Sequence, residues 1–118
     1  MYIVGFVIPV AEKNLDAFKA WSQNAAKLLM EYGCIEVVEA WEENVPDGNQ
    51  TDFRRAVSIE SGEKVVFSWQ KWPDKESVAA VERAMSNDPR FDPPVEVPFD
   101  QRRLIMGCFS PVTHMQVK

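Results

Sequence analysis

The first strand predicted from the sequence constrains the fold most, because it is apolar on both faces. A strand directs alternate side chains to opposite faces, and residues 2–9 are rich in β-branched and aromatic residues. One face would carry Tyr2, Val4, Phe6 and Ile8, and the other Ile3 and Val7. The last predicted strand, residues 104–109, has the same two-faced pattern. Strands of this kind need a covering layer on each side of the sheet.

Two amphipathic helices are predicted between these strands. The first has apolar residues at spacings of three and four, namely Leu15, Phe18, Trp21, Ala25, Leu28 or Leu29, and Tyr32. Asn14 is expected to cap its start and Gly33 to end it. The second is expected to start at an Asp74 N-cap and to end near Asn87. Its core stripe would be Val78, Val81 and Met85.

Two further strands, residues 35–42 and 64–72, complete the order β-α-β-β-α-β, the split βαβ motif. In this topology the first and third strands are central, and both helices cover one face of the sheet. The uncovered face would expose an apolar patch larger than monomers tolerate. A second copy of the sheet is the simplest cover. The sequence therefore predicts an α+β ferredoxin-like sandwich that forms a homodimer through the sheet face, a dimeric α+β barrel.

The length of 118 residues indicates a single ferredoxin-like domain over 1–118, with 111–118 as a loose tail. A net charge of −5 works against binding nucleic acid. The apolar N-terminus is too short to cross a bilayer and has no basic segment before it, so no membrane partner is expected. Cys34 and Cys108 form no disulfide framework, and we expect two buried free thiols in the cytoplasm.

Four segments in order along the chain resemble the YbaA-like bacterial proteins, an uncharacterised family catalogued as a domain of unknown function, DUF1428. They are Val45–Gly48, Thr51–Phe53, Val65–Trp69 and Pro98–Asp100. The resemblance extends over nearly the whole chain, from Val4 to about Pro111. It implies a member of the dimeric α+β barrel superfamily and implies no reaction. Gln101 and Cys108 depart from the family pattern, which has glycine at both places.

Glu39 is the carboxylate whose position breaks its local pattern, because Ile35, Val37 and Trp41 share its face of the second strand. If that face is buried, the pKa of Glu39 rises towards that of a useful general base. The alternatives are a Glu on an edge strand with its carboxylate in water, or one paired with an arginine. Glu39 is our candidate catalytic residue.

Residues 47–55 and 99–103 place acids and arginines beside aromatic residues. They could bind a small anionic ligand through a bidentate guanidinium, or hold two loops together by Asp–Arg pairs. The candidate ligand-binding residues are Trp41, Arg54, Trp69, Asp100 and Arg102. Core and interface packing would explain most of the four tryptophans. The single histidine, His114, has no partner at metal-ligand spacing, so no metal is expected. The sequence shows no nucleotide-binding glycine loop, and no cofactor is expected.

Three functions remain open at this point. The first is a dimer that binds a small molecule between sheet and helices. The second, by analogy with other dimeric α+β barrels, is a cofactor-free oxygenase- or isomerase-like enzyme acting on a small aromatic or keto substrate. Glu39 would be its base, and Arg54 or Arg102 its oxyanion partner. The third is a stress or regulatory protein that acts through protein partners.

Overall fold

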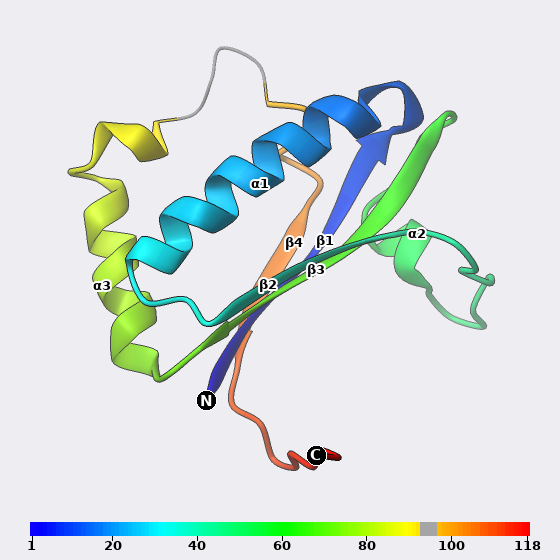
Figure 1. Cartoon of the computed structure of the whole chain (residues 1–118). Helices are drawn as coiled ribbons and strands as arrows, with labels where there is room; N and C mark the ends of the chain where they lie inside the picture. The colour runs from blue at the N-terminus through cyan, green and yellow to red at the C-terminus, as the bar shows by residue number, and fades with distance from the viewer. Residues whose placement is uncertain (93–96) are drawn as a thin grey trace.

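The computed structural model describes residues 1–92 and 97–118 and has the predicted order of strands and long helices (Figure 1). The strands are β1 (Tyr2–Ala11), β2 (Glu36–Trp41), β3 (Glu63–Trp72) and β4 (Ile105–Phe109). They pair antiparallel in the order β2-β3-β1-β4, so β1 and β3 are central as predicted. Pro93 and Pro94, which contributed to the expectation of an irregular 90–102 segment, lie outside the described residues.

The two long helices, α1 (Leu15–Glu31) and α3 (Lys75–Met85), begin and end close to the predicted residues. The described residues also form a short α2 (Phe53–Ala56) and the 3-10 turns η1 (Glu12–Asn14) and η2 (Pro89–Phe91). Gly33 has a φ of 105°, which favours glycine and ends α1. The Asp74 carboxylate accepts from the Ser77 N–H at 2.8 Å and caps α3. Asn14 precedes α1 but makes no side-chain cap, because η1 leads directly into the helix.

Strand register divides the sheet into two faces. On the helix-side face, Val4 and Ile8 of β1 are buried beside Val66 and Trp72 of β3. The opposite face, which we call the open face, carries alternate residues of all four strands: Ile3, Val7, Val38, Ala40, Val65, Phe67, Trp69, Ile105 and Phe109. The predicted assignment of side chains to the two faces of β1 is therefore confirmed.

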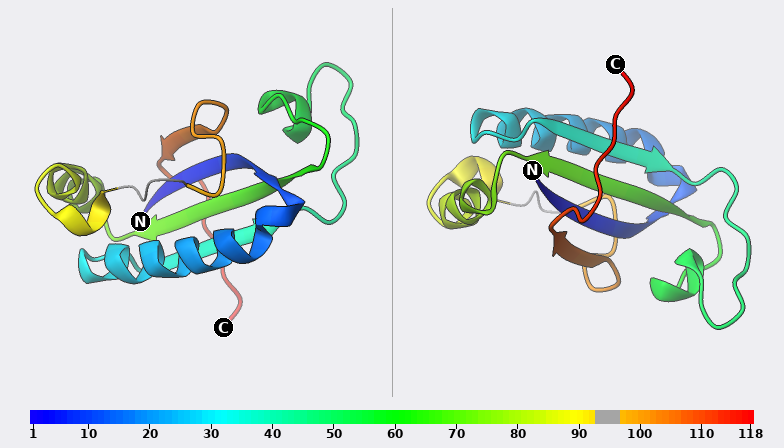
Figure 2. Two further views of the ribbon diagram at one scale, coloured as in Figure 1. Left: turned by 90° about the horizontal axis from the view of Figure 1, so that it is seen from above. Right: turned by 90° about the horizontal axis from the view of Figure 1, so that it is seen from below.

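The core lies between the helix-side face and the two long helices. One cluster joins Val78 and Val81 of α3 to Val4 and Trp72, and a second joins Phe18 of α1 to the other end of the sheet. Figure 2 shows α1 along the β2 side of the sheet and α3 beside the end of β3, away from β4.

Two predictions of burial are wrong. Met85 was expected in the core stripe of α3, but it ends the helix and is 43% exposed. Cys108 was expected to be buried like Cys34, and it is exposed. The physical reason is that β4 is an edge strand, paired only with β1, and α3 does not extend over it.

Candidate functional site

A cavity of about 1030 Å³ lies between the helix-side face and α1. Strands β1, β2 and β3 form its floor, α1 forms one wall, and side chains from residues 85–92 and 97–104 form the other. Small-molecule sites typically measure about 300–1,000 Å³, so this cavity is large enough for a ligand of drug size.

Apolar and aromatic side chains form most of the cavity wall. Phe6 and Ile8 come from β1, Trp21 from α1, and Phe99 and Leu104 from the segment before β4. The rings of Trp21 and Phe99 meet edge to face with centroids 4.9 Å apart, so α1 and the 97–104 segment are joined across the cavity. This lining favours an apolar or aromatic ligand.

Glu39 lies on the floor of the cavity, directly opposite Ser68 of β3. Val37 and Trp41 share its face, as the period-two pattern of β2 indicates. Burial raises the pKa of the Glu39 carboxyl, and a hydrogen bond with Ser68 opposes this in part. Its Oε2 atom is buried and has no hydrogen-bond partner among residues 1–92 and 97–118. The described part of the chain also places no basic side chain in an ion pair with Glu39.

Ser68 and Gln70 of β3 extend the polar part of the floor, and neither was among the residues predicted from the sequence. Ser68 is fully buried, and Gln70 is half-buried. The Gln70 Oε1 atom accepts a hydrogen bond of 2.9 Å from the indole Nε1–H of Trp72. Both residues interrupt an apolar strand face, the same signal that identified Glu39.

The two predicted tryptophans lie on opposite faces of the sheet. Trp41 is on the helix-side face and lines a smaller recess of about 350 Å³ that also contacts Glu39. Trp69 pairs with Gly5 on the open face, on the other side of the sheet from the cavity. The structure therefore brings Trp41 close to Glu39 and does not bring Trp69 there.

Arg54 is held in an ion pair with Glu42, away from the cavity lining. The Glu42 side chain is almost fully buried, accepts from the Val65 N–H at 3.0 Å, and lies 3.7 Å from the Lys64 ammonium. Hydrogen bonding to Arg54 and Val65 keeps the pKa of Glu42 low in spite of its desolvation. These contacts attach α2 and the preceding loop to the beginning of β3.

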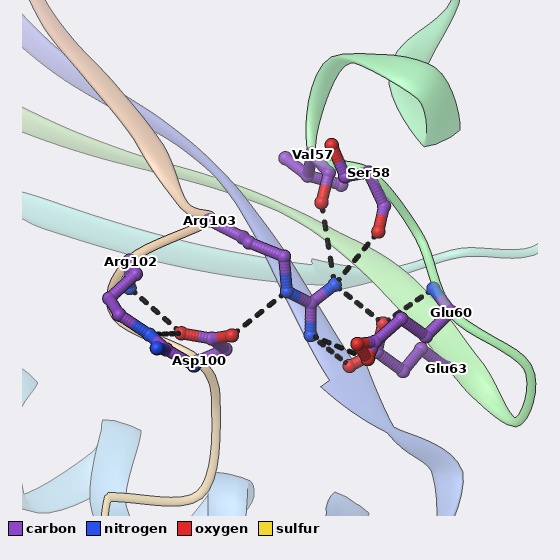
Figure 3. Close-up of polar contacts among 7 residues, drawn as sticks. All are labelled: Val57, Ser58, Glu60, Glu63, Asp100, Arg102 and Arg103. Carbon is purple, nitrogen blue, oxygen red and sulfur yellow. Dashed lines mark hydrogen bonds and ion pairs between the residues drawn. The ribbon is translucent and has the colours of Figure 1, made fainter.

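Asp100 and Arg102 belong to a second polar cluster, outside the cavity, with Arg103 at its centre (Figure 3). Arg103 donates to Asp100 at 2.9 Å and to both carboxylate oxygens of Glu63, at 2.8 and 2.6 Å. Hydrogen bonds lower the pKa of Asp100 to about 2, and the bond from Arg103 has a larger effect than either of those from Arg102. Arg102 itself is 91% exposed and meets Asp100 at 3.3 Å. The Asp100 pairs with Arg102 and Arg103 lie within the 97–104 segment, and the Arg103–Glu63 pair joins that segment to the first residue of β3.

Arg90 is the basic side chain that lines the described part of the cavity, and acids on both sides engage it. It donates to Asp88 at 2.8 Å and to Glu31 at 2.7 Å. The Tyr32 hydroxyl also donates to Asp88, at 2.7 Å. The Arg90 guanidinium is therefore already paired with acidic side chains at the edge of the cavity.

The described residues gather no set of three or more His, Cys, Asp or Glu side chains such as a metal site would require. None of the helices in residues 1–92 and 97–118 has the length and hydropathy needed to cross a bilayer.

Comparison with known proteins places the chain in a family. The family model described as a protein of unknown function, DUF1428, matches residues 1–101. Over 112 residues the chain is 43% identical to the uncharacterized protein YbaA of Escherichia coli K12, covering 94% of this chain and 96% of the relative. The uncharacterized protein YbaA of Shigella flexneri matches with the same identity and coverage.

Two solved structures share the fold. Both are described as dimeric ferredoxin-like proteins from an uncultured marine organism. The first has a TM-score of 0.55 and 12% identity, and covers 99% of this chain and 100% of its own. The second has a TM-score of 0.50 and 13% identity, and covers 98% of each chain. The fold is ferredoxin-like, and the chain belongs to the DUF1428 family of proteins of unknown function, as the four sequence segments indicated.

Proposed function

We propose that this protein is a homodimer that binds a small, largely apolar molecule in the cavity between the sheet and α1. The Oε2 atom of Glu39 supports this most directly, because it is buried on the cavity floor without a hydrogen-bond partner in the described residues. A buried polar atom without a partner costs free energy, and native proteins usually satisfy such an atom with a protein group, an ordered water or a bound molecule. A donor group on a ligand would supply the partner.

The open face supports the homodimer. Phe67, Ile105 and Phe109 on this face are 50%, 45% and 58% exposed. The ring of Phe53 of α2 lies beside the ring of Phe67, with centroids 5.7 Å apart. A second copy of the sheet, packed about 10 Å away, would bury all of these side chains. The two solved structures compared above are both described as dimeric.

We place the protein in the cytoplasm, as its cysteines suggest. Cys34 and Cys108 are unpaired, and the reducing cytoplasm keeps thiols in that state.

A thermal-shift screen against neutral and charged metabolites tests the binding role. A ligand at 100 times its Kd would stabilise the wild type by about 2.7 kcal/mol. Ala25 lines the cavity from α1, so Ala25→Phe should fill the space and abolish the shift. The exposed Ala80 of α3 lies outside the lining, and Ala80→Phe should keep the shift. Ligands that stabilise Ala25→Phe as strongly as the wild type would show that they bind elsewhere.

The environment of Glu39 favours a second candidate, a cofactor-free enzyme in which Glu39 is the general base. Burial raises the pKa of this carboxyl, which makes it a better proton acceptor near neutral pH. Arg54 and Arg102 do not line the cavity, so an oxyanion partner would have to come from Ser68 or Gln70. Compounds that bind should then exchange an acidic C–H proton for deuterium in D2O. Glu39→Gln should stop the exchange while binding persists; exchange that continues in this variant would exclude Glu39 as the base.

A further inference from the structure

The hydrogen bond with Trp72 determines the orientation of the Gln70 amide. The indole Nε1–H of Trp72 is a donor only, and it meets Gln70 Oε1 at 2.9 Å. Trp72 is completely buried, so no water can replace this acceptor. The carbonyl oxygen of the Gln70 amide therefore faces Trp72, and its NH2 group is the part available to the cavity that Gln70 lines.

Gln70 and Glu39 can contact the same small molecule. Glu39 is registered with Ser68, and Gln70 with Val37, so Glu39 and Gln70 are diagonal neighbours on the helix-side face. Diagonal neighbours on adjacent strands lie about 7–8 Å apart, which long side chains can bridge through a ligand. Gln70 offers a hydrogen-bond donor, its NH2 group, and Glu39 offers an acceptor oxygen that has no partner in the described chain.

Charge around the cavity disfavours an anionic ligand. Glu39 repels an anion, and Arg90, the basic side chain lining the described cavity, is already bound by Asp88 and Glu31. A cationic ligand would satisfy Glu39 but would leave the NH2 group of Gln70 without an acceptor. A neutral molecule with one acceptor and one donor satisfies both side chains.

We propose that the cavity selects neutral, largely apolar molecules in which a carbonyl oxygen stands beside an N–H or O–H donor, as in a primary carboxamide or a lactam. The carbonyl oxygen accepts from the Gln70 amide, and the donor bonds Glu39. This inference rests on the proposed binding role of the cavity and adds the ligand class.

Three matched probes test the inference: 2-naphthamide, 2-naphthoate and N,N-dimethyl-2-naphthamide. Each is titrated into 15N-labelled protein while the indole N–H signal of Trp72 is followed. The primary amide should bind roughly tenfold more tightly than either of the others, the effect of one well-made hydrogen bond. Gln70→Met should weaken the binding of 2-naphthamide roughly tenfold, because its carbonyl oxygen loses the Gln70 donor, and the matched variant Gln116→Met in the exposed tail should leave that affinity unchanged.

A second variant covers the case in which Gln70→Met fails to fold because Trp72 has lost its acceptor. Gln70→Glu keeps an oxygen for Trp72 and replaces the NH2 donor by an acceptor. It should weaken 2-naphthamide binding and strengthen binding of 2-naphthylmethylammonium.

Equal affinity for amide and carboxylate would overturn the inference, as would an unchanged affinity for 2-naphthamide in either Gln70 variant or no binding by any of the three probes. The metabolite screen with Ala25→Phe judges the binding role independently, so the two proposals can fail separately.

Discussion

Replacement of Arg103 by methionine should destabilise the fold more than any other single loss of charge on the 97–104 segment. The Arg103 guanidinium donates to Glu63, to Asp100 and, at 3.0 Å, to the carbonyl oxygen of Ser58. Methionine keeps much of the aliphatic side chain and removes all of these hydrogen bonds. Glu63 and Asp100 would remain as neighbouring carboxylates without their shared cation.

The expected magnitude follows from the exposure of this cluster. Breaking a fully buried ion pair from one side costs about 3–5 kcal/mol, and breaking an exposed one costs about 0–1 kcal/mol. The side chains of Arg103 and Glu63 are 19% and 13% exposed, which places the pair between these limits. We expect a loss of about 2–3 kcal/mol, or about 8–12 °C in Tm at roughly 4 °C per kcal/mol for a domain of this size.

Urea unfolding followed by tryptophan fluorescence measures this loss, and the adjacent arginine provides a control. Arg102 is 91% exposed and has one long contact, so Arg102→Met should change the free energy of unfolding by less than about 0.5 kcal/mol. A double-mutant cycle with Glu63→Gln isolates the pair. If Arg103→Met costs no more than Arg102→Met, the cluster is a surface feature and this reasoning is wrong.

The pH dependence gives an independent check of the same cluster. Hydrogen bonds from Arg103 lower the pKa of Glu63, and they are the largest cause that brings the pKa of Asp100 to about 2. In the unfolded chain these carboxyls titrate near pH 4. Their contribution is complete above the unfolded pKa and is lost as the pH falls through the folded pKa. The stability gap between wild type and Arg103→Met should therefore shrink from about pH 5 towards pH 2.

Three further predictions concern the sheet. Burial raises the pKa of Glu39, so the wild type should lose stability as the pH rises from the unfolded pKa through the folded one. Glu39→Gln should not show that loss; the same pH dependence of the free energy of unfolding in both proteins, measured with urea, would contradict this. Phe67→Asp on the open face should convert a dimer of twice 13.5 kDa to monomer in sedimentation equilibrium; a wild-type monomer at micromolar concentration would exclude the dimer. A thiol reagent should modify Cys108 in the native protein and Cys34 only after unfolding, as mass spectrometry would show; equal native reactivity would refute this.

Local patterns made the strand faces and one helix start predictable. Side chains alternate with period two in any strand, so the partition of β1 and β3 followed from their residues alone. The Asp74 cap of α3 was predictable because capping involves only neighbouring residues. The exposure of Met85 and Cys108 was not, because it depends on where α3 lies over the sheet, and distant packing determines that position.

The candidate site was predictable to a similar degree. Glu39 was found because it breaks an apolar strand face, and Ser68 and Gln70 break the same face of β3 between Val66 and Trp72. That signal could have identified both. Which of Arg102 and Arg103 turns inward could not be read from two adjacent identical residues, since the path of the 97–104 segment determines it.

Strand β3 contributes side chains to both proposed surfaces. This double role gives the many hydrogen bonds at the beginning of the strand their importance. Ser68 and Gln70 face the cavity, while Phe67 and Trp69 face the proposed dimer contact. A slip of one residue would exchange the two sets and destroy both surfaces at once.

The side-chain contacts at the beginning of β3 oppose such a slip, because they join it to residues outside the strand. Glu63, the first residue of the strand, accepts a hydrogen bond from Arg103. Two residues later, the Val65 N–H donates to the Glu42 carboxylate. The Arg103 cluster thus lies outside the cavity but supports it, because the residues that would contact a ligand depend on the register of this strand.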